Sequence, residues 1–564
     1  MLRDWVRSLC PPDVLSRPVE TQPECAALAW AASGAMDLTG RPDGAPVISP
    51  AAAYGLLLEA TEALARITAQ IGSEVRADPG LLLAGRAGCL DLRRGGRETV
   101  GRAGRLLRTS DGWCAITLSR QDDIDSVPAI LGADSVSDDP WATLTRAARE
   151  WTATDLADRA QLLGVPAAAL PSAAYPAAAL SAAGPPVDAH SAAALSGAAP
   201  HAAAVPVDAD PVAAVPAIAP RAAAVPVDAD RAAVVPAAAD SVAAVPVEAG
   251  PAAALPAAAH PADALAADAH PADALAADAH PADALAADAH PATRLPDGAA
   301  PPVARPSAAM SATSGIQFPW QTTRIAEPVL GARLDGAVVV DLSSMWAGPL
   351  CAHLLGRAGA RVVKVESPRR PDGARRGDPR FFDWLHCGHE QIVVDFHTPA
   401  GQETLRELVS TADVVIEASR PRALAQLGLA PGDRVHRDGQ VWLSLTGYGR
   451  AEPMRVAFGD DAAVAGGLVG WDAGEPVFCG DAIADPLTGI CAALAVCCAV
   501  LGGGGQLIDL SMRGTAAAFA SAPALTHGPH RVLADGADWV VECPHYGRSQ
   551  RVLRPRVPQL GGAA

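Results

Sequence analysis

Apolar residues follow a strand, helix, strand pattern between residues 334 and 368, LDGAVVVDLSSMWAGPLCAHLLGRAGARVVKVESP. The short apolar runs 338–340 and 362–365 predict two strands, and apolar positions at helical spacing predict a helix over 350–358. The small-residue turn 347–349 precedes that helix. Such a βαβ unit places a loop and a helix start where a phosphate group can bind, although a crossover without a ligand has the same pattern.

A second apolar stretch, 490–501, lies between Asp485 and the glycines 502–505. It is too short for a convincing membrane span. The pattern instead predicts a buried helix, in which Cys497 and Cys498 serve as small hydrophobic residues.

Composition changes between residues 166 and 306, where Ala, Pro, Asp and His dominate and HPADALAADA repeats in tandem over 260–289. Few large apolar side chains are available there to offset the ordering entropy. We therefore expect a disordered or partly helical linker over 166–324, between a first region at 1–165 and a second at 325–564. A histidine every ten residues in a flexible chain lacks fixed geometry, so the sequence predicts no metal site.

Charge and cysteine content limit the location and the partners. The formal net charge of -18 disfavours binding to nucleic acid or to an anionic membrane. The 11 cysteines form no CxxC pair, and the first residues, MLRDWVRSLCPPDV, have no apolar core of a secretory leader. These features favour reduced thiols in a cytoplasmic protein.

Six blocks in a fixed order carry a resemblance to a known family. They are the 334–368 unit, VVDFHTPAGQETLRELV (393), ADVVIEASRP (412), LSLTGYGR (443), GDDAA (459) and GDAIADPLTGICAA (480). Together they resemble the class III (CaiB/BaiF) CoA-transferases, which include formyl-CoA and carnitine CoA-transferases and α-methylacyl-CoA racemases. The resemblance implies an α/β fold with a Rossmann-like parallel sheet and a small domain, acyl-CoA as a substrate without a permanently bound cofactor, and a homodimer.

The first region resembles a later piece of the same family. Residues 39–67 look like its aspartate loop and long helix, and 106–123 look like the strand pair that opens its small domain. The first βαβ half is absent from this region and is supplied by 325–564. The two regions thus look complementary, either because they assemble one family-like unit or because one of two aspartate loops has degenerated.

The resemblance implies an aspartate nucleophile that accepts an acyl group from a thioester and then forms an aspartyl-CoA intermediate. Thr39, Gly40, Asp43, Gly44 and Pro46 match the family motif Thr-Gly-x-x-Asp-Gly-x-Pro, which makes Asp43 the best candidate. In the second region VGWDAGEP has Ala473 in the aspartate column and Asp472 one position early, a weaker candidate. Pro-Asp-Gly at 42–44 is also typical of a simple turn.

Racemase chemistry is the enzymatic alternative, and it needs an acid and a base on opposite faces of the α-carbon. The related racemases imply an Asp at Asp485 and a His where this chain has Asp460. Asp460 or Asp461 with Asp485 would then form a carboxylate pair. Capping of a helix that begins near Pro486 explains Asp485 equally well.

CoA contacts carried over by position fall on five residues, with Lys364, the only lysine, as a sixth candidate. The five are Trp346, Ala347, Ser367, Ala418 and Ser419. The chain departs from the family at HCGHEQ (386–391), where a basic block is usual, and at Ala473. The predicted function is CoA transfer between an acyl-CoA and a carboxylic acid, and a degenerate noncatalytic paralogue is the nonenzymatic alternative.

Overall fold

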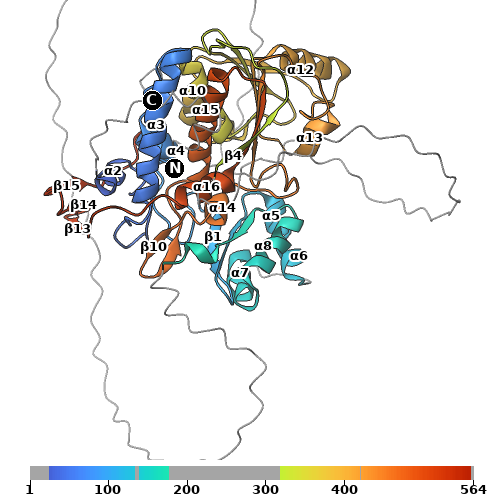
Figure 1. The fold of residues 1–564 in the computed structure, drawn as a ribbon. Helices are drawn as coiled ribbons and strands as arrows, with labels where there is room; N and C mark the ends of the chain where they lie inside the picture. The colour runs from blue at the N-terminus through green and yellow to red at the C-terminus, as the bar shows by residue number, and fades with distance from the viewer. Residues whose placement is uncertain (1–24, 134–138, 177–317, 420, 560–564) are drawn as a thin grey trace, which may run out of the picture. The chain divides into compact units, whose positions relative to one another are not determined.

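The computed structural model describes residues 25–133, 139–176, 318–419 and 421–559, which belong to one compact unit (Figure 1). Most of the predicted linker lies outside these residues. Two strands nevertheless fall inside its predicted range, β3 (Ala167–Ala169) and β4 (Trp320–Arg324). An alanine run gives no strand pattern, and β4 has one buried residue, Trp320, so neither strand was evident from the sequence. The three-region division stays a prediction.

A seven-stranded sheet forms the centre of the second region. Its strands in spatial order are β4, β12 (Gln506–Ser511), β9 (Val441–Thr446), β8 (Val414–Glu417), β5 (Val338–Asp341), β6 (Arg361–Glu366) and β7 (Glu390–Val393). Each neighbouring pair is parallel except β4 with β12. Helix α10 (Ala347–Arg357) connects β5 to β6, which confirms the predicted βαβ unit.

Alternate residues of the central strands face opposite layers of helices, because side chains along a strand alternate between its faces. One face packs on α10 and α15 (Ala484–Leu501), and it includes Val339, Ile416 and Leu443. The other packs on α12 (Pro399–Thr411) and α13 (Pro421–Gln426), and it includes Val340, Val415 and Trp442. Burial on both faces explains the continuous apolar runs in the sequence.

Helix α15 lies at the centre of the largest core, as predicted for the 490–501 stretch. Among the described helices it alone has the length and mean hydropathy, 1.9, that a membrane span requires, but 94% of it is buried inside the protein. Burial of that extent is typical of the core helix of a folded domain. The prediction of a buried helix is confirmed.

The first region supplies helices to this same core. Helix α3 (Ala51–Ile71) packs along α15 (Figure 1), and it confirms the predicted long helix. Backbone hydrogen bonds join the first region to the second. Leu334 N–H donates to Ile71 C=O (2.7 Å), and Ser73 N–H donates to Ala358 C=O (2.8 Å). Helices α2 (Ala26–Ala32) and α4 (Pro79–Leu90) complete this layer.

A separate small core lies between a three-stranded antiparallel sheet and a group of short helices. The sheet order is β1 (Gly104–Arg108), β2 (Trp113–Thr117) and β3, which confirms the strand pair predicted at 106–123. The helices are α5 (Gln121–Asp125), α6 (Val127–Leu131), α7 (Pro140–Ala147) and α8 (Ala153–Leu162).

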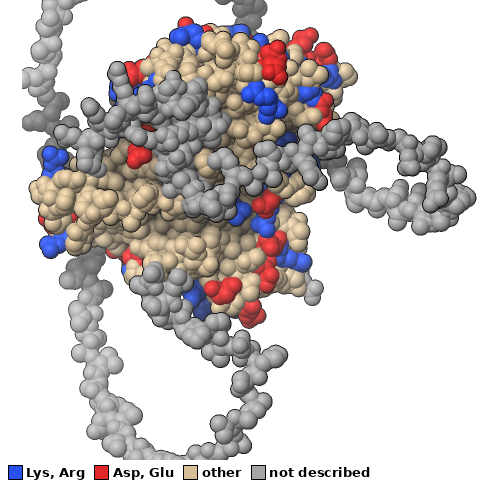
Figure 2. Space-filling view, viewed as in Figure 1, with Lys and Arg blue, Asp and Glu red and all other residues tan. Residues whose placement is uncertain are grey.

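The remaining elements follow the central sheet or extend from it. They are α11 (Pro379–Leu385), α14 (Gly459–Ala465), the hairpin β10 (Gly470–Asp472) and β11 (Glu475–Val477), α16 (Met512–Ala520), and the sheet β13 (Arg531–Asp535), β14 (Asp538–Cys543) and β15 (Arg548–Arg551). In Figure 2, acidic and basic side chains are interspersed over the α12 side and over α5, α6 and α8.

Candidate active site

Three loops at one edge of the central sheet hold the positions assigned to CoA. Trp346 and Ala347 follow β5, Ser367 follows β6, and Ala418 and Ser419 follow β8. These strands are parallel neighbours, so the loops lie at the same edge. The chain order reverses between β5 and β8, because β6 and β7 lie on one side and β9 and β12 on the other. Open α/β sheets bind ligands at such a reversal point.

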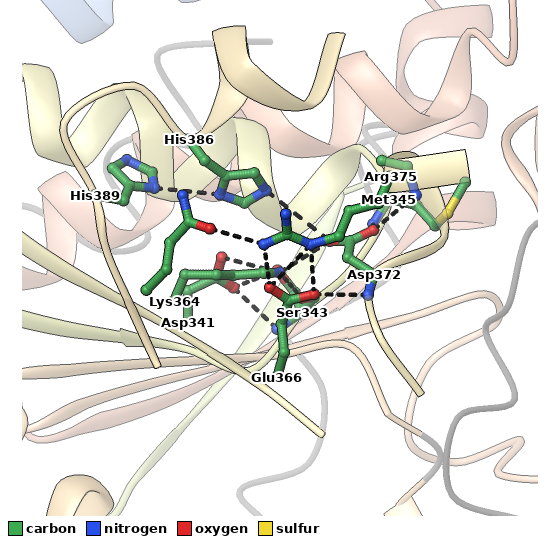
Figure 3. Close-up of polar contacts among 11 residues, drawn as sticks. Asp341, Ser343, Met345, Lys364, Glu366, Asp372, Arg375, His386 and His389 are labelled. Atoms are coloured by element: carbon green, nitrogen blue, oxygen red, sulfur yellow. Dashed lines mark hydrogen bonds and ion pairs between the residues drawn. The ribbon is translucent and has the colours of Figure 1, made fainter. Parts of the chain in front are cut away.

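Lys364 lies in a buried network beside these loops (Figure 3). Its ammonium is 3.0 Å from Asp372 Oδ2 and 3.6 Å from Asp341 Oδ2, and it donates to the carbonyl of Ser343. Burial alone lowers the pKa of Lys364, but Asp341 and Asp372 outweigh it and raise the pKa above its ordinary value. Lys364 is therefore charged and enclosed by carboxylates. Direct contact with a ligand would require this network to open.

The network fixes the loop that presents Trp346. Asp341 Oδ1 accepts from the Ser343 backbone N–H (2.9 Å) and from its hydroxyl, and Asp372 Oδ1 accepts from Met345 N–H (3.0 Å). Met345 has a left-handed backbone, with φ of 73°. A Cβ on Gly348 would lie 2.1 Å from Ser343 Oγ, so only glycine fits there. Lys364 and its partners thus hold the first turn in one conformation.

The HCGHEQ departure borders the same network. His386 Nε2 lies 3.9 Å from Asp372 Oδ2, and burial followed by the charge of Lys364 lowers the pKa of His386 far below its ordinary range. Arg375 is held by Glu366 (2.6 Å) and by Gln391 Oε1 (2.7 Å). The polar groups of these side chains are engaged with one another. None of these side chains therefore replaces the missing basic block as a ligand for a phosphate group.

A cluster of four aspartates lies where α14 and α15 begin. Asp460 and Asp461 are in the first turn of α14, Asp485 is in the first turn of α15, and Asp481 precedes α15. Asp461, Asp481 and Asp485 are 0%, 1% and 4% exposed. Such burial of carboxylates is costly unless charge or hydrogen bonds compensate for it.

Arg86, from α4 of the first region, supplies that compensation. Its guanidinium is 2.6 Å from Asp481 Oδ1, and Asp460 Oδ1 accepts from Ala482 N–H (3.1 Å). Burial raises the pKa of Asp460 to about 8, the charges of Asp481 and Asp485 add to the rise, and Arg86 opposes it. Asp460 is therefore protonated at neutral pH, whereas Asp481 pairs with Arg86.

Asp460 lies near enough to Asp485 for the Asp485 charge to contribute to its raised pKa, and the carboxylate-pair alternative stays a prediction. A Cβ on Gly459 would lie 2.5 Å from Asp485 Oδ2 and 2.2 Å from the carbonyl of Ala482. The start of α14 therefore approaches the Asp485 carboxylate as closely as a glycine allows. Asp461 has a different role, because its Oδ1 accepts from Phe458 N–H (3.0 Å) and so caps α14.

The carboxylate cluster adjoins the sheet edge that holds the predicted CoA positions. Arg86 lies over the indole of Trp346, 5.9 Å from the ring centroid. Helices α10 and α15 are in close contact, since a Cβ on Gly489 would lie 2.7 Å from the carbonyl of Ala347. The turn of Trp346 and Ala347 is thus packed against α15, whose first turn contains Asp485.

Asp43 and Asp472 lie on two loops that contact each other. Asp43 is exposed on a turn closed by a hydrogen bond from Gly44 N–H to Arg41 C=O (3.1 Å), so the turn expected at 42–44 is present. Asp472 ends β10 and pairs with Arg41 (3.0 Å). The assignment of Asp43 as the nucleophile stays a prediction.

An open cavity of about 640 Å³ borders the two aspartate loops. Its lining includes Ser49 from the first loop, Trp471 from the second, and Tyr448, Asp509 and Arg513 around the ends of β9 and β12. Trp471 N–H donates to Ser49 Oγ (2.9 Å), which joins the loops across this wall. The cavity offers room for a substrate beside the sheet edge.

Sequence reasoning missed three charged residues at these sites. Arg86 and Asp481 are 395 positions apart, so no local motif could connect them. Glu417 ends β8 at the reversal point, where burial raises its pKa to about 7 although Ser444 and Arg450 oppose the rise. The sequence signal that could have identified Glu417 is its position at the end of an apolar strand, directly before Ala418.

Comparisons with known proteins agree with these blocks. Residues 334–541 match the sequence model of CoA-transferase family III. A succinate–glutarate CoA-transferase of Agrobacterium fabrum is 34% identical over 202 residues, covering 32% of this chain and 50% of that protein. A succinyl-CoA–D-citramalate CoA-transferase of Chloroflexus aurantiacus is 32% identical over 197 residues, covering 32% of this chain and 49% of that protein.

A solved CaiB/BaiF family protein from Brucella suis is 28% identical, with coverage of 37% of this chain and 65% of that chain and a TM-score of 0.33. The chain spans about half the length of the curated relatives it matches.

Proposed function

Because residues 334–541 belong to CoA-transferase family III, we propose that the protein transfers CoA between an acyl-CoA thioester and a carboxylic acid. The observation that carries the proposal is the buried carboxylate cluster of Asp460, Asp481 and Asp485 beside the Trp346 loop. A strongly perturbed carboxyl group such as that of Asp460, next to a ligand-binding edge, is a candidate for a catalytic role.

CoA would bind at the carboxyl ends of β5, β6 and β8. Backbone groups of Trp346 and Ala347 at the start of α10 would face a phosphate, and Ser367, Ala418 and Ser419 would line the same edge. Arg369 and Arg376 are exposed after β6 and would supply positive charge to the phosphates. Arg375 is already engaged by Glu366.

Asp485 is the nucleophile that the geometry favours. It lies in the first turn of an 18-residue helix, where the helix dipole stabilises a carboxylate. Its oxygen would attack the thioester carbonyl, so that an O–C bond forms, the C–S bond breaks and CoA leaves as a thiolate. The thiolate then attacks the Asp485 carbonyl of the mixed anhydride, which releases the donor acid and leaves an aspartyl-CoA thioester.

The second half of the reaction reverses these steps with a new acid. The acceptor carboxylate attacks the aspartyl thioester and expels the CoA thiolate, and the thiolate attacks the acceptor carbonyl of the new anhydride. Asp485 is regenerated as a carboxylate and the acceptor leaves as its CoA thioester. Asp460, protonated at neutral pH, would donate a hydrogen bond to the oxyanion that develops at each attack.

A trapping experiment tests this assignment. The protein is incubated with succinyl-CoA, the first choice because two relatives act on succinate or succinyl-CoA by name, and the adduct is trapped with hydroxylamine or borohydride and mapped by peptide mass spectrometry. We expect modification of Asp485. Asp485→Asn should lower transfer by at least about 10³-fold, whereas Asp43→Asn and Asp472→Asn should retain it.

An adduct on Asp43 or Asp472 would move the nucleophile to an aspartate loop. Measurable CoA binding without any adduct, across a panel of short and branched acyl-CoAs, would contradict the transferase mechanism. Absence of CoA binding at millimolar concentration would favour the noncatalytic paralogue.

The racemase alternative rests on the same pair of carboxyl groups. Asp460 as the acid and Asp485 as the base could exchange the α-proton of an acyl-CoA, because the raised pKa of Asp460 keeps it protonated. Solvent deuterium would then enter the α-carbon without acyl transfer. The homodimer and the cytoplasmic location stay predictions.

A further inference from the structure

Two cysteines and two histidines meet at a place that the proposed CoA chemistry does not use. Cys25 precedes α2, His527 and His530 lie between α16 and β13, and Cys543 is the last residue of β14. Each offers one ligand atom, and the four atoms all lie within 4.8 Å of one another. Among the described residues, this is the group of Cys, His and acidic side chains whose geometry suits a metal ion.

The distances are close to those around a bound zinc ion. Cys25 Sγ lies 3.0 Å from His530 Nε2 and 3.3 Å from His527 Nε2. In a tetrahedral site with metal–ligand bonds of about 2.0 to 2.3 Å, the ligand atoms lie about 3.3 to 3.8 Å apart. Adjustments of a few tenths of an ångström would therefore bring the nearest atoms into place. We propose that Cys25, His527, His530 and Cys543 bind a Zn²⁺ ion.

The donor set determines which metal fits. Two thiolate sulfurs and two imidazole nitrogens match Zn²⁺, whereas Mg²⁺ and Ca²⁺ require oxygen ligands. Four protein ligands close the coordination sphere and leave no position for a substrate, so the site is structural. Both cysteines are buried, at 4% and 1% exposed, which shields the metal–sulfur bonds from water.

The surroundings of His527 also suit a metal ligand. Its Nε2 faces Cys25, while its Nδ1 lies 3.4 Å from Thr526 Oγ1. His545 stacks on its ring at a centroid distance of 4.8 Å and an interplanar angle of 28°, and Tyr546 packs edge-on at 5.0 Å. Metal-bound histidines are generally oriented by such a contact on the second nitrogen and by packing of the ring.

The metal would fasten the two ends of the described chain. Cys25 precedes the helix α2, which packs against β14 and β15, and Leu553 N–H donates to Ala31 C=O (2.9 Å). The ligands span 505 positions between Cys25 and His530, so one bound ion closes a very long loop. Binding to a preformed site of this kind adds directly to the stability of the folded state.

The first test measures zinc in the full-length protein, purified without chelators and without a histidine tag. Elemental analysis should give about one zinc ion per chain. Cys25→Ser and Cys543→Ser should each reduce it to about a tenth of that value or less. Cys387→Ser is the matched control, because Cys387 is exposed and outside the cluster, and this variant should retain the metal.

Cobalt substitution of the wild-type protein gives a second measurement that does not depend on the variants folding. Co²⁺ bound by two thiolates and two imidazoles should show intense visible bands of a tetrahedral ion together with a thiolate charge-transfer band. Absence of both zinc and this spectrum would overturn the proposal. So would a Cys25–Cys543 disulfide in freshly purified protein, detected by intact mass before and after reduction.

Discussion

His353 shows how a single buried imidazole makes stability depend on pH. It lies on α10, it is 7% exposed, and its ring packs beside Trp384. Burial, with smaller contributions from His389 and Arg357, lowers the pKa of His353 to about 3. The unfolded chain binds this proton near the ordinary pKa of about 6.5, so stability is complete above that pH and falls as the pH drops below it.

We expect that His353 alone lowers the free energy of unfolding by about 2 kcal/mol when the pH falls from about 7.5 to about 5. Urea unfolding at both pH values measures this difference. His353→Gln should lose less stability on acidification than the wild type, whereas the exposed control His397→Gln should lose as much. Equal losses in all three proteins would show that the His353 imidazole does not titrate on unfolding.

Single residues also show what the sequence could predict of the site. Trp346, Ala347 and Asp485 stand in blocks with a strong local pattern, and the structure packs the turn of Trp346 and Ala347 against α15, whose first turn contains Asp485. Arg86 could not be assigned, because its ion pair with Asp481 depends on how α4 packs in the folded protein. Lys364 was noticed for its rarity, but its full burial depends on Asp341 and Asp372, which only the fold places around it.

Contact between α10 and α15 is the feature of the secondary-structure elements that most directly shapes the candidate site. Gly489, in the second turn of α15, faces the first turn of α10, and a Cβ there would lie 2.7 Å from Ala347 O and 2.9 Å from Leu350 Cβ. Alanine in a helix is favoured over glycine by up to about 1 kcal/mol, but overpacking against backbone costs about 1 to 3 kcal/mol. The clash should therefore dominate.

Gly489→Ala should lower the unfolding free energy and weaken CoA binding, because the loop of Trp346 and Ala347 has to move. Thermal unfolding and a CoA titration measure the two effects. Gly514→Ala is the matched control, since it also lies in a helix but its Cβ would meet nothing closer than 3.4 Å, so it should be neutral or stabilising. A Gly489→Ala protein as stable as the control would mean that the helices separate without cost.

The sequence could predict those helices and strands whose apolar residues recur with a distinct period. The β5–α10–β6 unit, α3 and α15 combine long apolar patterns with clear ends, and each was predicted. The strand β3 consists of three alanines, and it forms because its backbone pairs with β2. The run GWDAGEPV gives the β10–β11 hairpin, whose turn uses Ala473 and Gly474 at φ of 50° and 81°. Pairing partners decide such short strands, and the local sequence does not reveal them.

At the scale of the whole molecule, the described parts of the first and second regions share one hydrophobic core. Leu57, Leu64 and Ile67 of α3 are fully buried in the same cluster as Ile490 and Leu494 of α15. The ion pair of Arg86 with Asp481 also joins the first region to the second. The resemblance had suggested complementary regions, and the packing of α3 on α15 gives that suggestion a physical basis. Neither stretch should be stable by itself.

Fragments that end and begin at the limits of the described structure test this dependence. Residues 318–564 expressed alone would expose the face of α15 that α3 covers, and an apolar surface of that kind leads to aggregation. We expect this fragment to be insoluble alone, and to copurify as a soluble complex when it is coexpressed with residues 1–176. Size-exclusion chromatography and thermal unfolding, with the intact chain as the reference, measure both outcomes.

A fragment 318–564 that is monomeric and unfolds cooperatively at the temperature of the intact chain would show that α3 contributes little. Since that fragment lacks Arg86, the same result would show that the Arg86–Asp481 ion pair is not needed to keep the carboxylate cluster folded.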